Sequence, residues 1–155
     1  MRLHMGIGAF VLAISAAGVT AAPPDTNACA LLTRDEAAAA AGSAVAEGKP
    51  HAGGGLSGQG VDVTNCTYSG GGKELVVNLW SFSPKAQASL DVYRGLCKKK
   101  EQAAGLGDLA CWYNADHKEL QVLKGSSLLI LELRGRRDAS DALVTAAKQA
   151  LARLR

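Results

Sequence analysis

The feature that most constrains this chain is its N-terminal segment. Arg2 and His4 precede an apolar run over residues 6–17, and Val19-Thr20-Ala21 then places small residues where a signal peptidase cleaves. This pattern predicts a secretory signal over residues 1–21. The apolar run is too short to span a bilayer, and no second apolar stretch of about twenty residues follows it. We therefore expect an exported protein, periplasmic or extracellular, without a transmembrane segment.

The size and charge of the remainder limit its class. Cleavage after Ala21 would leave 134 of the 155 residues, which is the size of one ordinary domain. We expect a mobile lead-in over residues 22–28 and a single domain over residues 29–155. The chain has 17 basic and 14 acidic residues, and the signal removes one of the basic ones. This near-neutral balance and the exported compartment argue against nucleic acid as a partner.

All four cysteines, Cys29, Cys66, Cys97 and Cys111, lie after the predicted cleavage point. An even number of cysteines in an oxidising compartment predicts disulfides. No C-x-x-C is present, and no histidine lies beside a cysteine pair at ligand spacing, so a redox or zinc site is disfavoured. Four cysteines allow three pairings.

Local patterns predict an α+β fold. Thr33 and Glu36 form a capping box before a run of alanines that ends at Gly42, and Ser83-Pro84 begins a second helix. Gly-rich residues 42–60 indicate a long flexible loop. Strands are expected at 61–68, 74–82, 110–114, 119–124 and 128–134, and a last helix after Asp138. We predict an antiparallel sheet of about five strands, with the apolar last strand central and the helices packed on one face.

The two halves of the chain resemble each other. Cys66-Thr67-Tyr68 followed by residues 73–77 has the same spacing as Cys111-Trp112-Tyr113 followed by residues 118–122. One interpretation is a helix and hairpin used twice, related by a pseudo-twofold axis, and the other is coincidence. The repeat favours the disulfides Cys29–Cys66 and Cys97–Cys111.

Few residues are candidates for chemistry. His51 and His117 are the only histidines after the signal, and neither has a nucleophile that can be paired with it. The glycine-rich residues 53–60 lack the Gly-Lys-Ser/Thr ending of a phosphate loop, so a linker is favoured. We therefore expect no catalytic residue, no cofactor and no metal site.

Two basic clusters are candidates for contacts with an anion or a partner. Lys98, Lys99 and Lys100 form one cluster, and Arg134, Arg136 and Arg137 form the other. If the fold brings them together, they could hold a lipid headgroup, a cell-wall polymer or an acidic protein face. The alternative is that both are solvated element ends. Trp80 or Trp112, if exposed, would mark a binding patch.

Several short motifs resemble a known group of proteins. Residues 29–33 (CALLT), Cys66-Thr67-Tyr68 and residues 105–110 (GLGDLA) are similar to small secreted domains of unknown function that are frequent among actinobacterial envelope lipoproteins. The outline is also similar to the extracellular sensor domain of a mycobacterial receptor kinase. The resemblance implies a disulfide-stapled α+β domain in the cell envelope, with sensing or partner binding as its role. The chain departs from such lipoproteins because no cysteine directly follows its apolar run.

The sequence therefore predicts a non-enzymatic exported envelope domain that binds a protein or a small envelope ligand. The expected surface is the solvent side of the sheet together with Arg134, Arg136 and Arg137. One alternative is an inhibitor or immunity-type protein that inserts residues 53–60 into a hydrolase. Another is a small hydrolase that uses His51 or His117. The oligomeric state is not indicated by any pattern.

Overall fold

The computed structural model describes residues 27–51 and 59–154. The predicted signal, most of the predicted lead-in and most of the glycine-rich segment lie outside these ranges. Within them, no helix has both the length and the apolar character needed to cross a membrane. The elements, in chain order, are η1 (Ala28–Ala30), α1 (Arg34–Ala41), β1 (Lys49–His51), β2 (Val61–Gly70), β3 (Lys73–Phe82), η3 (Pro84–Ala86), α2 (Gln87–Cys97), β4 (Leu109–Trp112), β5 (Glu119–Lys124), β6 (Ser127–Arg134) and α3 (Ser140–Arg153).

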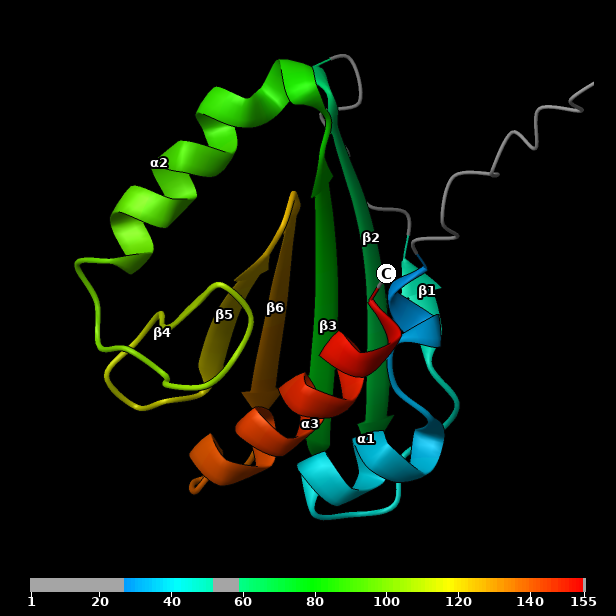
Figure 1. Cartoon of the computed structure of the whole chain (residues 1–155). Coiled ribbons are helices and arrows are strands. Elements are labelled where there is room, and N and C mark those ends of the chain that lie inside the picture. Colours follow the sequence, from blue (N-terminus) through cyan, green and yellow to red (C-terminus); the bar gives the residue numbers. More distant parts are fainter. Residues whose placement is uncertain (1–26, 52–58, 155) are drawn as a thin grey trace, which may run out of the picture.

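The strands form one antiparallel sheet in the order β1-β2-β3-β6-β5-β4 (Figure 1). The predicted α+β class is confirmed, and β6 lies inside the sheet as expected from its apolar sequence. The sheet has a sixth strand, β1, in the segment predicted to be a loop. All three β1 side chains are exposed, so this edge strand has no alternation of apolar and polar residues from which it could be predicted.

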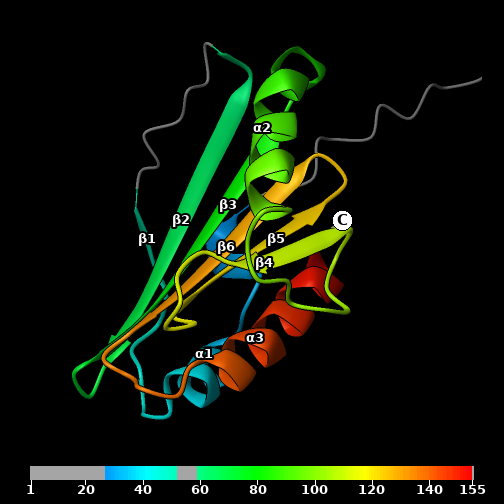
Figure 2. The same cartoon turned by 90° about the vertical axis from the view of Figure 1, so that its left-hand side faces the viewer.

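Helices lie on both faces of the sheet. Leu75, Val77 and Leu79 of β3 pack in the same cluster as α1 and α3, and we call this side the α1/α3 face. Trp80 and Phe82, which point the other way, pack with α2, and we call that side the α2 face. Figures 1 and 2 show α1 and α3 side by side, with α2 apart from them.

The prediction that the helices pack on one face is therefore corrected. The apolar stripe of α2 indicates that the helix packs on something, but it does not specify which side of the sheet. Cys111 decides the side, because it points to the α2 face and is bonded to Cys97 at the end of α2. Its neighbours Ala110 and Trp112 pack in the cluster on the α1/α3 face.

Both predicted disulfides, Cys29–Cys66 and Cys97–Cys111, are present, and they lie on opposite faces. The strand order is also symmetric about β6, with β3 and β2 on one side and β5 and β4 on the other. This topology agrees with a twofold axis along β6. The pairing registers differ by one residue, however, since Cys66 lies opposite Val77 whereas Cys111 lies opposite Gln121 rather than Val122.

An ion pair joins the two helices of the α1/α3 face. The capping box of α1 is formed, with Glu36 accepting from the backbone N–H of Thr33 at 2.8 Å. The same carboxylate accepts from both terminal nitrogens of Arg153 on α3, at 2.8 and 2.9 Å. These hydrogen bonds to Arg153 hold the pKa of Glu36 below its ordinary value.

Glu36→Gln is expected to lower the free energy of unfolding at pH 7 by about 1–2 kcal/mol, because it weakens a helix cap and a charged double hydrogen bond. The folded pKa of Glu36 is depressed, so its contribution is complete above the unfolded pKa of about 4.3 and is lost as the pH falls through the folded pKa. Urea unfolding at pH 7 and pH 3 measures both quantities. Glu47→Gln is the control, because Glu47 forms only an exposed ion pair, and we expect a change within about 0.5 kcal/mol. A deficit equal at both pH values would contradict this account.

Candidate functional site

Helix α2 covers only part of its face of the sheet. Leu90 packs there against Phe82, Leu123 and Leu128 and their neighbours in a small apolar cluster. Next to this cluster the sheet carries a groove of about 320 Å³, a volume within the range of small-ligand pockets. We call it the sheet groove, and it is lined by Val63, Asn65, Asn78, Trp80, Glu119, Ile130 and Glu132.

The sheet register places these residues together. Asn65 lies opposite Asn78, and Asn78 lies opposite Ile130, so three strands contribute one row across the groove. Glu119 lies opposite Glu132 in the next row. Paired residues in an antiparallel sheet share a face, so the side chains of each row point the same way. The groove is thus built on the rigid centre of the fold.

The two carboxylates of the groove differ in their partners. Glu132 accepts two hydrogen bonds from Arg134, both at 2.8 Å, and Arg134 also donates to Glu74 at 2.9 Å. These two carboxylates raise the pKa of Arg134, and Arg134 neutralises Glu132. Glu119 accepts from the side-chain amide of Gln121 at 3.0 Å, and no cation in residues 27–51 or 59–154 pairs with it. Glu119 is therefore an anion with acceptor capacity to spare.

An amide oxygen in the groove lacks a partner. Oδ1 of Asn65 is buried and accepts no hydrogen bond from the described residues. A buried acceptor in this state costs about 1–3 kcal/mol, so such atoms are rare in folded proteins. Asn65 lines the groove, so this unpaired amide lies at the wall of the groove.

Trp80 gives the groove an apolar side. Its ring lies edge-on to Tyr93 of α2 at a centroid distance of 5.6 Å and stacks with Phe82 at 6.4 Å. These contacts hold the indole at the border between the groove and the part of the sheet that α2 covers. Trp80 is partly exposed, whereas Trp112 is buried. Of the two tryptophans considered from the sequence, Trp80 is the one in a position to contact a ligand.

The arginines predicted as an anion site have structural partners instead. Arg134 is paired with Glu132 and Glu74, and Arg136 donates to the carbonyl oxygen of Ala40 at 2.6 Å at the C-terminal end of α1. Arg137 is exposed. Arg134 therefore pairs with carboxylates of β3 and β6, and Arg136 with a carbonyl oxygen of α1, while the side chain of Arg134 remains exposed.

The lysine cluster lies on a different element. Lys98 and Lys99 are exposed just after α2, and Lys100 donates to the carbonyl oxygen of Tyr113 at 2.8 Å. The lysines follow α2, whereas Arg136 caps α1 and Arg134 pairs on β6 and β3. The two basic clusters therefore lie on separate parts of the fold.

The two histidines do not share a site. His51 is exposed on β1, at one edge of the sheet, and His117 lies in the loop between β4 and β5, at the other edge. Nε2 of His117 is 2.9 Å from Glu101, and its ring lies 4.8 Å from that of Trp112. Neither histidine lines the groove. Residues 53–58, most of the segment invoked for an inhibitory plug, lie outside the described residues.

The sequence pattern predicted a binding surface on the solvent side of the sheet, but it did not indicate Asn65, Asn78, Glu119 or Glu132. The sequence did contain an indication of this site, because Asn78 and Glu132 interrupt the two most apolar central strands at positions that point to one face. Polar residues on one face of a central strand indicate that this face is open. In the described part of the chain, no group of three His, Cys, Asp or Glu residues is placed to hold a metal ion.

Comparison with known proteins found no matching family model, no matching curated protein and no matching solved structure.

Proposed function

We propose that this chain is an exported, non-enzymatic binding domain of the cell envelope whose ligand occupies the sheet groove. The observation that carries the proposal is a preformed groove on the sheet in which, among the described residues, the carboxylate of Glu119 has no cation partner and Oδ1 of Asn65 has no hydrogen-bond donor. Both the size and the mixed lining are typical of small-ligand sites.

The unused groups specify the chemistry of the ligand. Both are acceptors, and Glu119 is negatively charged, so the groove favours a molecule that donates hydrogen bonds and carries a positive charge. Trp80, Ile130 and Val63 favour an apolar body next to that charge. An alkyl or aryl ammonium group, free or on the side chain of a peptide, combines these properties.

Export is supported by the N-terminal signal pattern and by the two disulfides, since disulfides persist in oxidising compartments. A small envelope ligand or a lysine-bearing partner would be present there to occupy the groove.

Titration of the ¹⁵N-labelled chain with phenethylammonium tests the proposal. We expect weak, saturable binding, with the largest chemical-shift changes at the Trp80 indole, at the side-chain amides of Asn65 and Asn78, and at the backbone of Glu119. Glu119→Gln should weaken binding about tenfold, because it removes the charge from a charge-assisted hydrogen bond.

Glu47→Gln is the matched control, because it removes one negative charge from an exposed position that does not line the groove. It should leave the affinity unchanged. Shift changes concentrated outside the groove, or equal losses of affinity in the two variants, would contradict the proposal.

A further inference from the structure

Helix α2 has two apolar sides, of which the sheet buries one. Ala86, Leu90 and Cys97 pack onto the α2 face. On the opposite side, Val92 and Leu96 follow each other at a spacing of four residues and are 60% and 51% exposed. A helix on the surface of a soluble domain ordinarily presents polar residues there. Three large hydrophobic side chains are exposed in the described part of the chain, and two of them form this outer stripe.

The positive charge of the chain is concentrated at the same helix. Residues 85–100 carry five of the 17 basic side chains and one of the 14 acidic ones. The rest of the chain therefore has 12 basic and 13 acidic residues, so the net charge of +3 comes from this segment. A local concentration of this kind creates a positive potential over α2 and attracts anionic surfaces.

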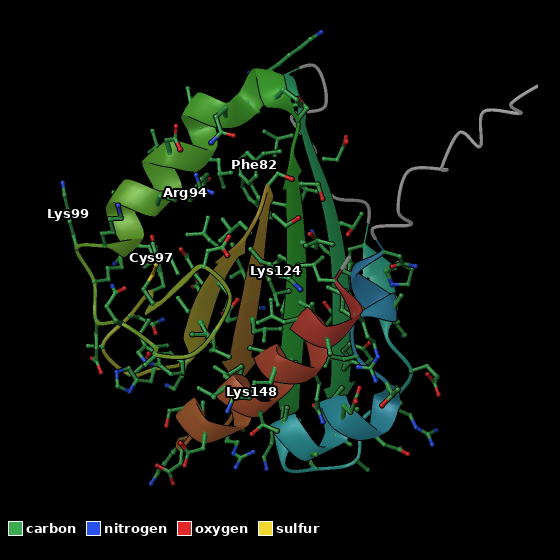
Figure 3. The ribbon with its side chains drawn as sticks, in the orientation of Figure 1. Phe82, Arg94, Cys97, Lys99, Lys124 and Lys148 are labelled. Carbon is green, nitrogen blue, oxygen red and sulfur yellow. A yellow bond between two sulfur atoms is a disulfide. The ribbon has the colours of Figure 1, made fainter. Side chains whose placement is uncertain are left out.

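Lysines flank the outer stripe at both ends, and their charges are available to an anionic surface. Lys85 precedes α2, and Lys98 and Lys99 follow it; all three are exposed, and no acidic group in the described residues pairs with them. Figure 3 shows Lys99 extending from the end of α2 away from the body of the protein. Lys100 lies 4.5 Å from the ring of Tyr113, the third exposed hydrophobic side chain.

We propose that the outer side of α2 binds the surface of a membrane that contains anionic lipids. Val92 and Leu96 enter the boundary between headgroups and acyl chains, and Lys85, Lys98 and Lys99 contact the anionic headgroups on either side of them. The two interactions are complementary, because aliphatic side chains alone bind weakly and lysines alone are screened by salt. This surface is separate from the sheet groove, so the inference does not depend on the proposed function.

Charge and shape favour a membrane over other occupants. A second copy of the chain would bring two lysine-rich helices together, and their like charges would repel. An acidic protein face would match the lysines but would require its own apolar patch to cover Val92 and Leu96. Helix α2 lies at the outside of the molecule (Figures 1 and 2), and Val92 and Leu96 are exposed along it, which suits a lipid surface.

Vesicle co-sedimentation tests the inference. The chain is isolated from an exporting host with its N-terminus identified by mass spectrometry, so that every variant shares the same N-terminal residues. We expect it to bind vesicles of phosphatidylglycerol and phosphatidylcholine much more strongly than vesicles of phosphatidylcholine alone. Binding should fall severalfold when NaCl is raised from about 0.1 to about 0.5 M.

Two variants separate the contributions. Lys98→Gln with Lys99→Gln should lower the partition coefficient about fivefold for each lysine removed, and Val92→Ser with Leu96→Ser should lower it at least tenfold. The matched control is Lys49→Gln with Lys148→Gln, which removes the same charge from exposed positions on β1 and α3 and should change little. Circular dichroism verifies that each variant is folded.

Three results would overturn the inference. The first is the absence of binding to the anionic vesicles. The second is an equal loss in the α2 lysine variant and the control variant. The third is a concentration-dependent dimer, detected by light scattering, that Val92→Ser with Leu96→Ser abolishes, because the stripe would then be covered by a second copy of the chain.

Discussion

Replacing Cys29 and Cys66 together by alanine is expected to lower the free energy of unfolding by about 4 kcal/mol. The disulfide joins residues 37 positions apart, and its removal restores to the unfolded chain the entropy of a loop of that length. Domains of this size are ordinarily stable by about 5–15 kcal/mol, so the loss is a large fraction of the total.

The surroundings of this disulfide add to the expected effect. Cys66 is fully buried on β2, and the hydroxyl of the neighbouring Tyr68 donates to the carbonyl oxygens of Leu32, at 2.7 Å, and Cys29, at 3.1 Å. Burial raises the pKa of Tyr68, which therefore remains a donor at neutral pH. Without the disulfide, η1 and the start of α1 would be held to β2 by these two hydrogen bonds and by the one that the backbone N–H of Ala28 donates to Oγ1 of Thr64 at 3.1 Å.

Urea unfolding of the oxidised chain and of the double variant measures the loss. Cys97→Ala with Cys111→Ala is the comparison, because this disulfide closes a shorter loop, of 14 positions, and should cost about 3 kcal/mol. A larger loss at Cys97–Cys111 than at Cys29–Cys66 would contradict this account of the two disulfides.

Leu131→Ala is the second change with a large expected effect. Leu131 lies on β6, the strand between β3 and β5, and its side chain is fully buried between the sheet and the helices of the α1/α3 face. The truncation removes buried apolar surface and leaves a cavity in a packed core, so we expect the free energy of unfolding to fall by about 2–5 kcal/mol.

Thermal or urea unfolding checks this value against Val92→Ala. Val92 is also aliphatic but is 60% exposed on α2, so its truncation should change the free energy of unfolding by no more than about 0.5 kcal/mol. Similar losses in the two variants would mean that β6 does not lie at the centre of the core.

Local signals were sufficient for much of this fold. The Thr33–Glu36 capping box and the apolar sequence of β6 each depend on residues close together in the chain, and each predicted its element correctly. The disulfide pairing followed from comparing the two halves, and it is also correct.

The features that the sequence left undetermined depend on long-range pairing. Helix α2 shows an apolar stripe, but the side of the sheet that it covers is decided by the orientation of Cys111, fourteen residues away. Strand β1 has exposed side chains only, so its existence depends on the unpaired edge of β2 rather than on its own composition.

The candidate site also depends on long-range pairing that local sequence does not show. The arginines formed a visible basic cluster, yet Arg134 is paired with Glu74, sixty residues away in the chain, and Arg136 with the end of α1. The groove is assembled from one or two residues on each of four strands, and only the register brings Asn65, Asn78 and Glu119 to one surface. The alternation of apolar and polar residues along a strand shows that one face of the sheet is open, but it does not show which polar groups on that face lack partners.

Isothermal titration with two probes of similar shape and opposite charge, phenethylammonium and 3-phenylpropanoate, measures whether the sheet groove binds a cationic donor. We expect the ammonium to bind at least tenfold more tightly and this preference to be lost in Glu119→Gln. Equal affinities, or tighter binding of the carboxylate, would show that the groove does not select a cation.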